Sequence, residues 1–405
     1  MAERPLRLLV VGCSWPLETF LERLFEGLAR TGIDVTIASA AAPDATWLRA
    51  NGMEWLHAPT WGDAIPRRLL RLGGMALRSA AGGRRDLGLL RPHVAALPRG
   101  VSRLRTWYRL LPLAGRPTDV IYFPWNSAAI SYVGLYDLGI PVLVSCRGSQ
   151  VNLGPHDPGR TELRDGLQVT LSRATAVHCV SRAIETEAKA YGLDPAKSRV
   201  IHPAVDPERF RPPARARTGA VARRVIAVGS LSWEKGFEYA LRSLRAARDA
   251  GSDVEFEIVG EGVDRQRLLF AIEDLGLSGC VRLSGQLLAD GVRERLQNAD
   301  LFLLSSVSEG LSNAALEAMA TGLPVVTTDC GGMREAVADG VEGFVVPTRD
   351  VKRMAAALGR LAQDSELRAR MGAAARARVL KEFTLERQVV AFTELLEEVR
   401  KCGRA

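Results

Sequence analysis

The chain has 405 residues, 47% hydrophobic and 25% charged, which is long enough for two ordinary domains with good cores. Its six cysteines are scattered, with no Cys-x-x-Cys pair or histidine cluster, so neither a zinc site nor a disulfide framework is expected, and a reducing cytoplasm is indicated. Leu6 to Val11 is too short for a signal sequence, and no apolar run approaches the roughly 20 residues that span a bilayer.

The net charge of +8 comes from one segment. Between Ile65 and Arg116 there are twelve arginines, no lysine and one acid, a net charge of +11 that leaves −3 for the rest. Leucines alternate with these arginines, so helices with an apolar face and a cationic flank are expected. This pattern suits an anionic membrane surface, and it also suits ordinary surface helices whose arginines extend over apolar neighbours. Nucleic acid is not expected, because no recognised reading module accompanies the charge.

Short apolar runs alternate with helical stretches in two rounds, which predicts two doubly wound α/β domains. The expected strands of the first round are Leu6–Val11, Val35–Ser39, Val120–Phe123, Val142–Ser145, Ala176–Val180 and Arg199–His202. Those of the second round are Val225–Val228, Glu255–Val259, Val281–Leu283, Leu301–Leu304, Val325–Thr328 and Gly343–Val346. A proline-rich linker separates them, so we expect domains at 1–206 and 222–384, a linker at 207–221 and a final segment at 385–405.

The second domain opens with a strand, a flexible turn and a lysine. After the strand Val225–Val228, the turn contains Gly229 and Ser230 and leads to Lys235, and a helical stretch follows. This arrangement predicts an anion site, although a solvated loop lysine has the same local pattern. After the next strand, Gly260 and Gly262 would let the backbone approach a ligand closely, but two such glycines more often form only a turn.

The segment from Ser308 to Ala320 is the most informative part of the sequence about function, because it contains two glutamates in positions suited to ligand binding. Glu309 lies in a loop of small residues after an apolar strand, and Glu317 lies about one turn into the next helix. Open α/β sheets bind ligands at this end of a strand, where a helix N-terminus can receive a phosphate. Glu317 could accept both hydroxyls of a ribose, and Glu309 a hydroxyl of a sugar. Alternatively, Glu309 is a solvated loop residue and Glu317 only complements the helix dipole.

The segment Ser308 to Pro324, read as SEGLSNAALEAMATGLP, resembles the nucleotide-sugar motif of the retaining glycosyltransferases of family 4. Ser14 to Phe20 resembles the S-E-T-F opening of exopolysaccharide and lipopolysaccharide glycosyltransferases, and Thr328 to Glu335 resembles the family's G-G-x-x-E element. The resemblance implies the GT-B fold, in which two Rossmann-like domains face a central cleft. In that fold the last helix, here about Leu385 to Lys401, crosses back onto the first domain.

The resemblance also implies roles for individual residues, with Glu309, Lys235 and Arg147 expected to be catalytic. Donor binding is expected of Gly229, Ser230, Lys235, Gly260, Gly262, Glu309, Gly310, Leu311, Ser312, Asn313 and Glu317, and acceptor binding of Trp15, Glu18 and Thr19. Arg147 stands where many members have a histidine, and arginine cannot exchange protons near neutral pH. We hypothesise that Arg147 partly replaces the cation that the family often has at the position of Ser230.

The implied reaction is metal-independent transfer, with retention, from a UDP- or GDP-sugar to a glycan, lipid-linked or small-molecule hydroxyl, without a cofactor. It would serve cell-surface polysaccharide or glycolipid biosynthesis at the cytoplasmic membrane face. The chain has no Asp-x-Asp motif, so lysine and backbone amides would stabilise the diphosphate. The alternatives are a non-catalytic nucleotide-sugar-binding scaffold and, within the same fold, an epimerase or phosphorylase. An oxidoreductase is disfavoured, because no Gly-x-Gly-x-x-Gly follows the first strand.

Overall fold

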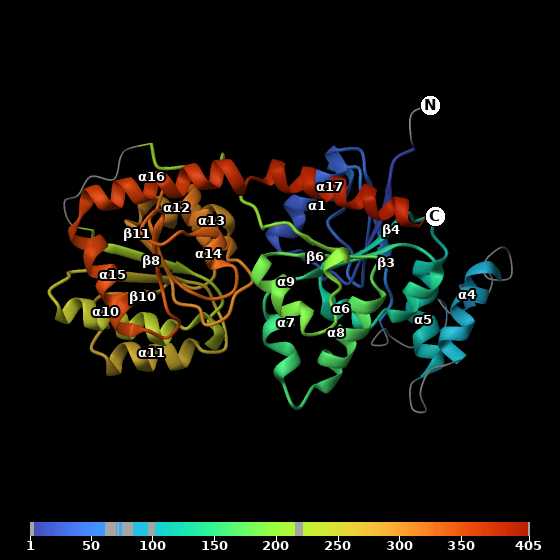
Figure 1. Cartoon of the computed structure of the whole chain (residues 1–405), viewed down its shortest axis with the longest axis horizontal. Helices are drawn as coiled ribbons and strands as arrows, with labels where there is room; N and C mark the ends of the chain where they lie inside the picture. The colour runs from blue at the N-terminus through green and yellow to red at the C-terminus, as the bar shows by residue number, and fades with distance from the viewer. Residues whose placement is uncertain are drawn as a thin grey trace. The chain divides into compact units, whose positions relative to one another are not determined.

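The computed structural model describes residues 4–60, 70, 73–74, 84–95, 102–214 and 222–403, which form two compact units (Figure 1). Unit 1 consists of Met1–Cys179, Glu185–Ile201 and Val389–Ala405. Unit 2 consists of Val180–Ile184 and His202–Gln388. The main division at Ile201 falls slightly before residue 206, where the sequence predicts the first domain to end.

Unit 1 contains a seven-stranded parallel sheet in the order β3-β2-β1-β4-β5-β6-β7. The strands are β1 (Arg7–Val11), β2 (Asp34–Ser39), β3 (Glu54–His57), β4 (Val120–Phe123), β5 (Val142–Cys146), β6 (Ala176–Cys179) and β7 (Ser198–Val200). Strands β4, β5 and β6 are buried throughout, as expected where helices cover both faces of a parallel sheet. The edge strand β3 was not predicted, because Glu-Trp-Leu-His is short and lacks a clear apolar period.

Helices cover both faces of this sheet. The helices of unit 1 are α1 (Thr19–Arg30), α2 (Ala45–Ala50), α4 (Arg84–Ala95), α5 (Arg103–Ala114), α6 (Asn126–Ile130), α7 (Ser149–Asn152) and α8 (Thr161–Arg173), with 3-10 turns η1 (Val133–Leu138), η2 (Gly154–His156) and η3 (Pro195–Lys197). Helix α9 (Arg182–Lys189) begins in unit 2 and continues into unit 1, and so does α17 (Leu385–Cys402). Phe25 of α1 and Phe392 of α17 both contact the ring of Tyr122 in β4, so these two helices share one face.

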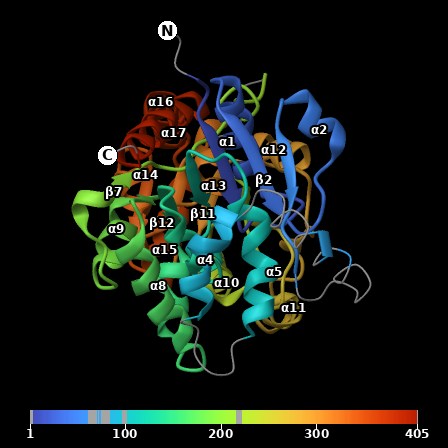
Figure 2. The ribbon, with the colours of Figure 1, turned by 90° about the vertical axis from the view of Figure 1, so that its right-hand side faces the viewer.

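Part of the arginine-rich stretch from Ile65 to Arg116, namely 65–69, 71–72, 75–83 and 96–101, lies outside the described residues. Its described helices α4 and α5 lie side by side (Figures 1 and 2). In α5, Leu110 and Leu113 are buried, whereas Arg103 and Arg105 are exposed at its first turn. Among the helices that the structure describes, none combines the length and apolar character needed to cross a membrane.

Unit 2 contains a six-stranded parallel sheet in the order β10-β9-β8-β11-β12-β13. The strands are β8 (Arg224–Val228), β9 (Glu255–Val259), β10 (Val281–Leu283), β11 (Leu301–Leu304), β12 (Val325–Thr328) and β13 (Gly343–Val346). All six strands agree with the sequence prediction to within one residue. The order along the sheet reverses between β8 and β11, as it does between β1 and β4 in unit 1, and such switch points are where open α/β sheets bind ligands.

Helices lie on both faces of this sheet as well (Figure 1). On one face are α10 (Phe237–Asp249), α11 (Arg265–Asp274) and α15 (Val351–Gln363), and on the other α12 (Ala289–Asn298), α13 (Asn313–Ala320) and α16 (Ser365–Glu382). The unit also contains α14 (Met333–Ala336) and the 3-10 turn η4 (Trp233–Lys235). The apolar core lies between each helical layer and the sheet.

Candidate functional site

Lys235 and Glu309 meet at the switch point of unit 2. Lys235 ends η4 after β8, and Glu309 lies in the loop after β11. The Lys235 Nζ donates to Glu309 Oε1 at 2.7 Å, and the Ser306 hydroxyl donates to the same oxygen at 2.8 Å. The side chains are only 23% and 9% exposed, so water screens the pair little. Two residues predicted from separate motifs therefore form one charged centre.

A glycine lets the two loops approach. Gly236 has a φ of 61°, and a Cβ at this position would lie 2.3 Å from the carbonyl oxygen of Ser305. The Ser305 hydroxyl donates to the Lys235 carbonyl at 2.9 Å, and the Val307 N–H donates to the Glu234 carbonyl at 2.8 Å. The backbone therefore sets the separation of Lys235 from the loop after β11, before either side chain contributes.

The glycines after β9 also serve loop packing. A Cβ on Gly260 would lie 1.8 Å from the carbonyl oxygen of Gly229, and one on Gly262 would lie 2.3 Å from that of Leu231. These contacts hold the loops after β8 and β9 together and account for both glycines without a ligand. Ser230 is exposed, and its hydroxyl lies 3.1 Å from that of Ser232. Donor binding by Gly229, Ser230, Gly260 and Gly262 stays a prediction.

Helix α13 begins as the sequence suggested. Ser312 is its N-cap, and the hydroxyl accepts a bond from the Ala315 N–H at 3.3 Å. The preceding Leu311 points into the apolar core, so only its backbone is available to a ligand. Glu317 is half-buried inside the helix. The structure therefore gives Ser312 and Leu311 structural roles beside the predicted binding roles.

Two polar atoms of the same segment lack hydrogen-bond partners. Ser308 Oγ and Asn313 Oδ1 are buried, and neither is hydrogen-bonded within the described parts of the chain. Buried polar groups are nearly always paired in folded proteins, so such atoms beside a switch point suit a polar ligand. Between them, the Gly310 carbonyl accepts a bond from the Ser181 hydroxyl at 3.0 Å.

Cys330, at the end of β12, lies beside this centre and was not singled out from the sequence. Burial, and to a smaller extent the negative charge of Glu309, raise the pKa of this thiol to about 12. The group therefore stays protonated near neutral pH and is not a nucleophile. Its proximity arises because β12 pairs with β11, which sequence spacing does not reveal.

Glu335 of the G-G-x-x-E element fastens the chain where it passes between units. Its carboxylate accepts the N–H groups of Arg182 and Ala183 at the start of α9, at 3.0 and 3.1 Å. It also lies 2.8 Å from His202 Nε2. Burial favours the protonated acid, but the hydrogen bonds from His202, Arg182 and Ala183 outweigh it and lower the pKa of Glu335. These contacts give Glu335 and His202 structural roles.

A cavity of about 660 Å³ lies at the switch point of unit 1. It is lined by Gly12, Ser14, Glu18, Trp125, Ser127, Ala128, Ile130, Ser131, Gln150, Arg160, Glu162 and Leu163. An aromatic ring, an amide and charged groups of both signs suit a polyhydroxylated ligand, because rings cover its apolar faces and polar groups bind its hydroxyls.

Only one of the three predicted acceptor residues lines this cavity, namely Glu18. Trp15 packs on Trp47 with ring centroids 5.4 Å apart, and Thr19 is exposed at the first residue of α1. Trp125 was missed. Its position two residues after the buried strand β4, at the switch point, is the pattern that could have identified it.

Arg147 lies in unit 1, just beyond β5. Its Nε donates to the Pro124 carbonyl at 3.0 Å, and Nη2 donates to the Tyr122 hydroxyl at 3.3 Å. The guanidinium carbon lies 4.7 Å from the centroid of the Phe20 ring. The side chain is therefore fixed inside its own unit, and replacement of a cation at Ser230, in unit 2, stays a prediction.

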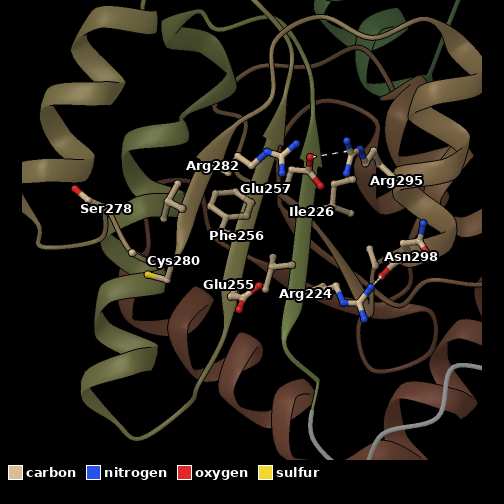
Figure 3. Close-up of a pocket in the computed structure, with 14 residues that line it drawn as sticks. Arg224, Ile226, Glu255, Phe256, Glu257, Ser278, Cys280, Arg282, Arg295 and Asn298 are labelled. Carbon is tan, nitrogen blue, oxygen red and sulfur yellow. Dashed lines mark hydrogen bonds and ion pairs between the residues drawn. The ribbon is translucent and has the colours of Figure 1, made fainter.

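Another cavity, of about 750 Å³, lies in unit 2, on the sheet near the beginnings of β8, β9 and β10. Figure 3 shows Arg282 and Arg295 on either side of Glu257, with Arg295 Nε 3.6 Å from Glu257 Oε1. Neither Lys235 nor Glu309 lines it. Because open α/β sheets bind ligands at the opposite ends of the strands, this cavity is not the predicted donor site.

Comparison with known proteins places the same segments in a family context. Residues 17–209 match the family model described as Glycosyltransferase Family 4, and residues 217–378 match that described as Glycosyl transferases group 1. The amylovoran biosynthesis glycosyltransferase AmsK of Erwinia amylovora is 33% identical over 224 residues, which cover 54% of each chain. The D-inositol 3-phosphate glycosyltransferase of Streptomyces griseus is 32% identical over 216 residues, which cover 46% of each. The chain spans about half the length of these relatives.

Among solved structures, Anabaena Alr3699/HepE in complex with UDP and glucose has the same fold, with a TM-score of 0.72 at 19% identity. The match covers 97% of this chain and 100% of that one. The predicted GT-B architecture is thus confirmed.

Replacing Lys235 tests the charged centre. The substitution Lys235→Met should lower the free energy of unfolding by about 1–3 kcal/mol, because a buried carboxylate then loses its partner. Adding Glu309→Gln should restore part of this loss, and urea denaturation of both single variants and the double variant measures the coupling. Lys352→Met, at an exposed lysine, is the control. Strictly additive effects of the two substitutions would contradict the pairing.

Glu335→Gln should also destabilise the protein at neutral pH, by about 1–3 kcal/mol, because the amide is a weaker acceptor for the start of α9. A carboxylate with a lowered folded pKa contributes its full stability above its ordinary pKa and loses it as pH falls through the folded value. The difference in the free energy of unfolding between Glu335→Gln and the wild type should therefore become smaller below about pH 4. Urea midpoints between pH 3 and 8 measure it, with exposed Glu273→Gln as control. A difference independent of pH would contradict this role.

Proposed function

The chain belongs to glycosyltransferase family 4, and we propose that it transfers a sugar from a nucleotide-sugar donor to an acceptor hydroxyl in the biosynthesis of a cell-surface polysaccharide or glycolipid. The observation that carries the proposal is the Lys235–Glu309 pair at the switch point of unit 2. An ammonium has three donors, and Glu309 uses one, so Lys235 can also bind a donor diphosphate. Its positive charge would then stabilise the negative charge that develops on the departing phosphate.

The rest of the donor would lie along the loop and helix after β11. Glu317 would accept the ribose hydroxyls, and Glu309 would orient the transferred sugar while it remains paired with Lys235. The partnerless Ser308 Oγ and Asn313 Oδ1 support this placement, since both would gain polar partners from the donor. A UDP-sugar is the favoured donor and a GDP-sugar the second, and the Anabaena neighbour was crystallised with UDP and glucose.

We propose that transfer retains the anomeric configuration and uses neither a metal ion nor a cofactor. The acceptor oxygen would bond to the anomeric carbon as the bond from that carbon to the phosphate oxygen breaks, and the departing oxygen would take the proton of the acceptor hydroxyl. The protein would contribute orientation and charge stabilisation, without a side chain that exchanges protons. The absence of an Asp-x-Asp motif from the sequence supports metal independence.

The acceptor would be a glycan or lipid-linked sugar that binds in the cavity of unit 1. The side chains of Trp125, Gln150 and Arg160 that line it favour a sugar ring over a hydrocarbon chain. The similarity to AmsK, named for amylovoran biosynthesis, supports a polysaccharide acceptor. Similarity to the D-inositol 3-phosphate enzyme supports the alternative of a small soluble acceptor.

A panel of donors tests the proposal. UDP-glucose, GDP-mannose and ADP-glucose are added to the protein, and the thermal midpoint and the rate of donor hydrolysis are measured. A donor present at 100 times its Kd should stabilise the fold by about 2.7 kcal/mol. Lys235→Ala should abolish most of this shift and the hydrolysis, whereas Lys352→Ala should retain both. Stabilisation without any turnover would instead identify a non-catalytic nucleotide-sugar-binding scaffold.

We also propose peripheral binding to the cytoplasmic membrane face, through the arginine-rich stretch. In its described part, the first turn of α5 exposes Arg103, Leu104 and Arg105 together, a pattern that suits an anionic lipid surface. Arg103 also donates to the Ala95 carbonyl at 3.3 Å, and the less exposed Arg109 donates to the Ser131 carbonyl at 3.0 Å.

Liposome flotation with phosphatidylglycerol vesicles tests this proposal. Replacing Arg103 and Arg105 by alanine should weaken binding about 10-fold or more, since each basic residue near the surface contributes about 1 kcal/mol. Binding should also weaken with added salt. Replacing the exposed Arg353 and Arg370 of unit 2 removes the same charge and should have little effect. Salt-independent flotation, or none, would reject membrane binding.

A further inference from the structure

A row of polar side chains is buried across the sheet of unit 1. Tyr122 of β4, Ser145 of β5 and His178 of β6 are each 0% exposed. Ser145 pairs in register with His178, and Tyr122 pairs with Leu143, so all three project from the same face. The aromatic ring of Phe392 packs against His178 at 4.6 Å and against Tyr122 at 6.0 Å. The row therefore lies in an apolar layer, where polar groups are costly to bury.

The three side chains form one continuous hydrogen-bonded chain. The Tyr122 hydroxyl lies 2.8 Å from Ser145 Oγ, and Ser145 Oγ lies 2.7 Å from His178 Nδ1. His178 Nε2 lies 2.8 Å from the carbonyl oxygen of Ile201. At the other end, Arg147 Nη2 donates to the Tyr122 hydroxyl at 3.3 Å. The chain thus begins beside β7 and ends at Arg147, beyond β5.

Its two ends fix the direction of every bond. A carbonyl oxygen can only accept, so His178 Nε2 carries a hydrogen and donates to Ile201. In the neutral ring Nδ1 then accepts from the Ser145 hydroxyl, and Ser145 accepts from Tyr122. At the far end Arg147 can only donate, and the phenolic oxygen of Tyr122 accepts from it. Burial raises the pKa of Tyr122, so the phenol keeps the proton that it donates.

The opposite direction fails at Arg147. If His178 were protonated, Nδ1 would donate to Ser145, and the Ser145 hydroxyl would have to donate to Tyr122. The Tyr122 hydroxyl hydrogen would then face a guanidinium, which has no acceptor. Among the hydrogen bonds given above, the arrangement that provides an acceptor for every hydrogen contains a neutral His178.

Stability by itself does not account for this chain. A buried hydrogen bond adds little net stability over a well-packed apolar pair, whereas each unpaired polar atom would be costly. What the chain achieves is orientation of Arg147. The guanidinium is also held by the Pro124 carbonyl and by the Phe20 ring, and within the described residues its Nη1 has no hydrogen-bond partner. The orientation of the Arg147 guanidinium is therefore fixed while some of its N–H donors remain available, as in arginines that bind ligands.

We propose that Tyr122, Ser145 and His178 are positioning residues that orient Arg147 for binding a substrate oxygen. This inference rests on the proposed function for the identity of the substrate, but the orientation of Arg147 can be measured without any activity. The relay acts only through Arg147, and its own side chains do not touch the substrate.

Tyr122→Phe tests the relay, because it removes one hydroxyl and keeps the ring. Tyr136→Phe is the matched control, since the Tyr136 hydroxyl in the same unit is buried without a hydrogen-bond partner among the described residues. With side-chain ¹⁵N-labelled arginine, the resonance of the Arg147 Nη2 group, which donates to Tyr122, is assigned by its loss in Arg147→Lys. It should be resolved and protected from exchange in the wild type and in Tyr136→Phe, and averaged in Tyr122→Phe. An unchanged resonance in Tyr122→Phe would overturn the proposal.

Kinetics supply the second readout, with hydrolysis of UDP-glucose or, if preferred by the enzyme, GDP-mannose. Tyr122→Phe should lower kcat about 10-fold with a smaller change in KM, because a misplaced group costs the transition state more than the ground state. In an Arg147→Ala background the same substitution should have no further effect. A full additional loss there would show that Tyr122 acts independently of Arg147 and would overturn the relay. If the wild type hydrolyses no donor, the proposed function fails and the resonance alone decides.

Discussion

The contact between the backbone of Gly236 and the carbonyl of Ser305 is the constraint on which the centre of unit 2 depends. Any larger residue would separate the loop after β8 from the loop after β11, since its Cβ would lie 2.3 Å from that oxygen. The separation would remove Lys235 from Glu309. Gly260 and Gly262 impose the same kind of constraint on the loop after β9. Glycines thus set the separation of the loops that carry Lys235 and Glu309, and this explains why glycines accompany these residues in sequence.

Each unit fixes a cation beyond the carboxyl end of a strand, Lys235 after β8 and Arg147 after β5, and the two units do so by different means. In unit 2 an ion pair fixes Lys235, so the lysine carries its own counter-charge. In unit 1 a neutral hydrogen-bonded chain and aromatic rings fix Arg147. Among the described residues no ion pair neutralises that guanidinium, so its charge can act on a ligand directly. The two means suit the two side chains. The ammonium of Lys235 is a compact point charge, whereas the guanidinium of Arg147 is planar and needs a defined orientation to bind a ligand.

The passages between the units are fastened by polar contacts of unit 2. Glu335 holds the start of α9 and His202, and the Gln388 side chain donates to the His202 carbonyl at 2.9 Å. Ser181, just before α9, donates to Gly310 in the loop that carries Glu309. The residues at which the chain leaves unit 2 are therefore linked by a short contact, through Ser181, to the loop that carries Glu309.

Most of the strands, the doubly wound class and the importance of Lys235 and Glu309 could be predicted from the sequence, because hydrophobic period and strand-to-helix turns are local properties of the chain. The sequence missed β3, which is short and mixed in polarity, and it did not reveal that Leu311 faces the core or that Trp15 packs on Trp47. Only the tertiary structure brought Tyr122, Ser145 and His178 together, since they lie on three strands separated by long helical connections. Sheet order and register decide such neighbours, and neither is encoded in the spacing of residues along one strand.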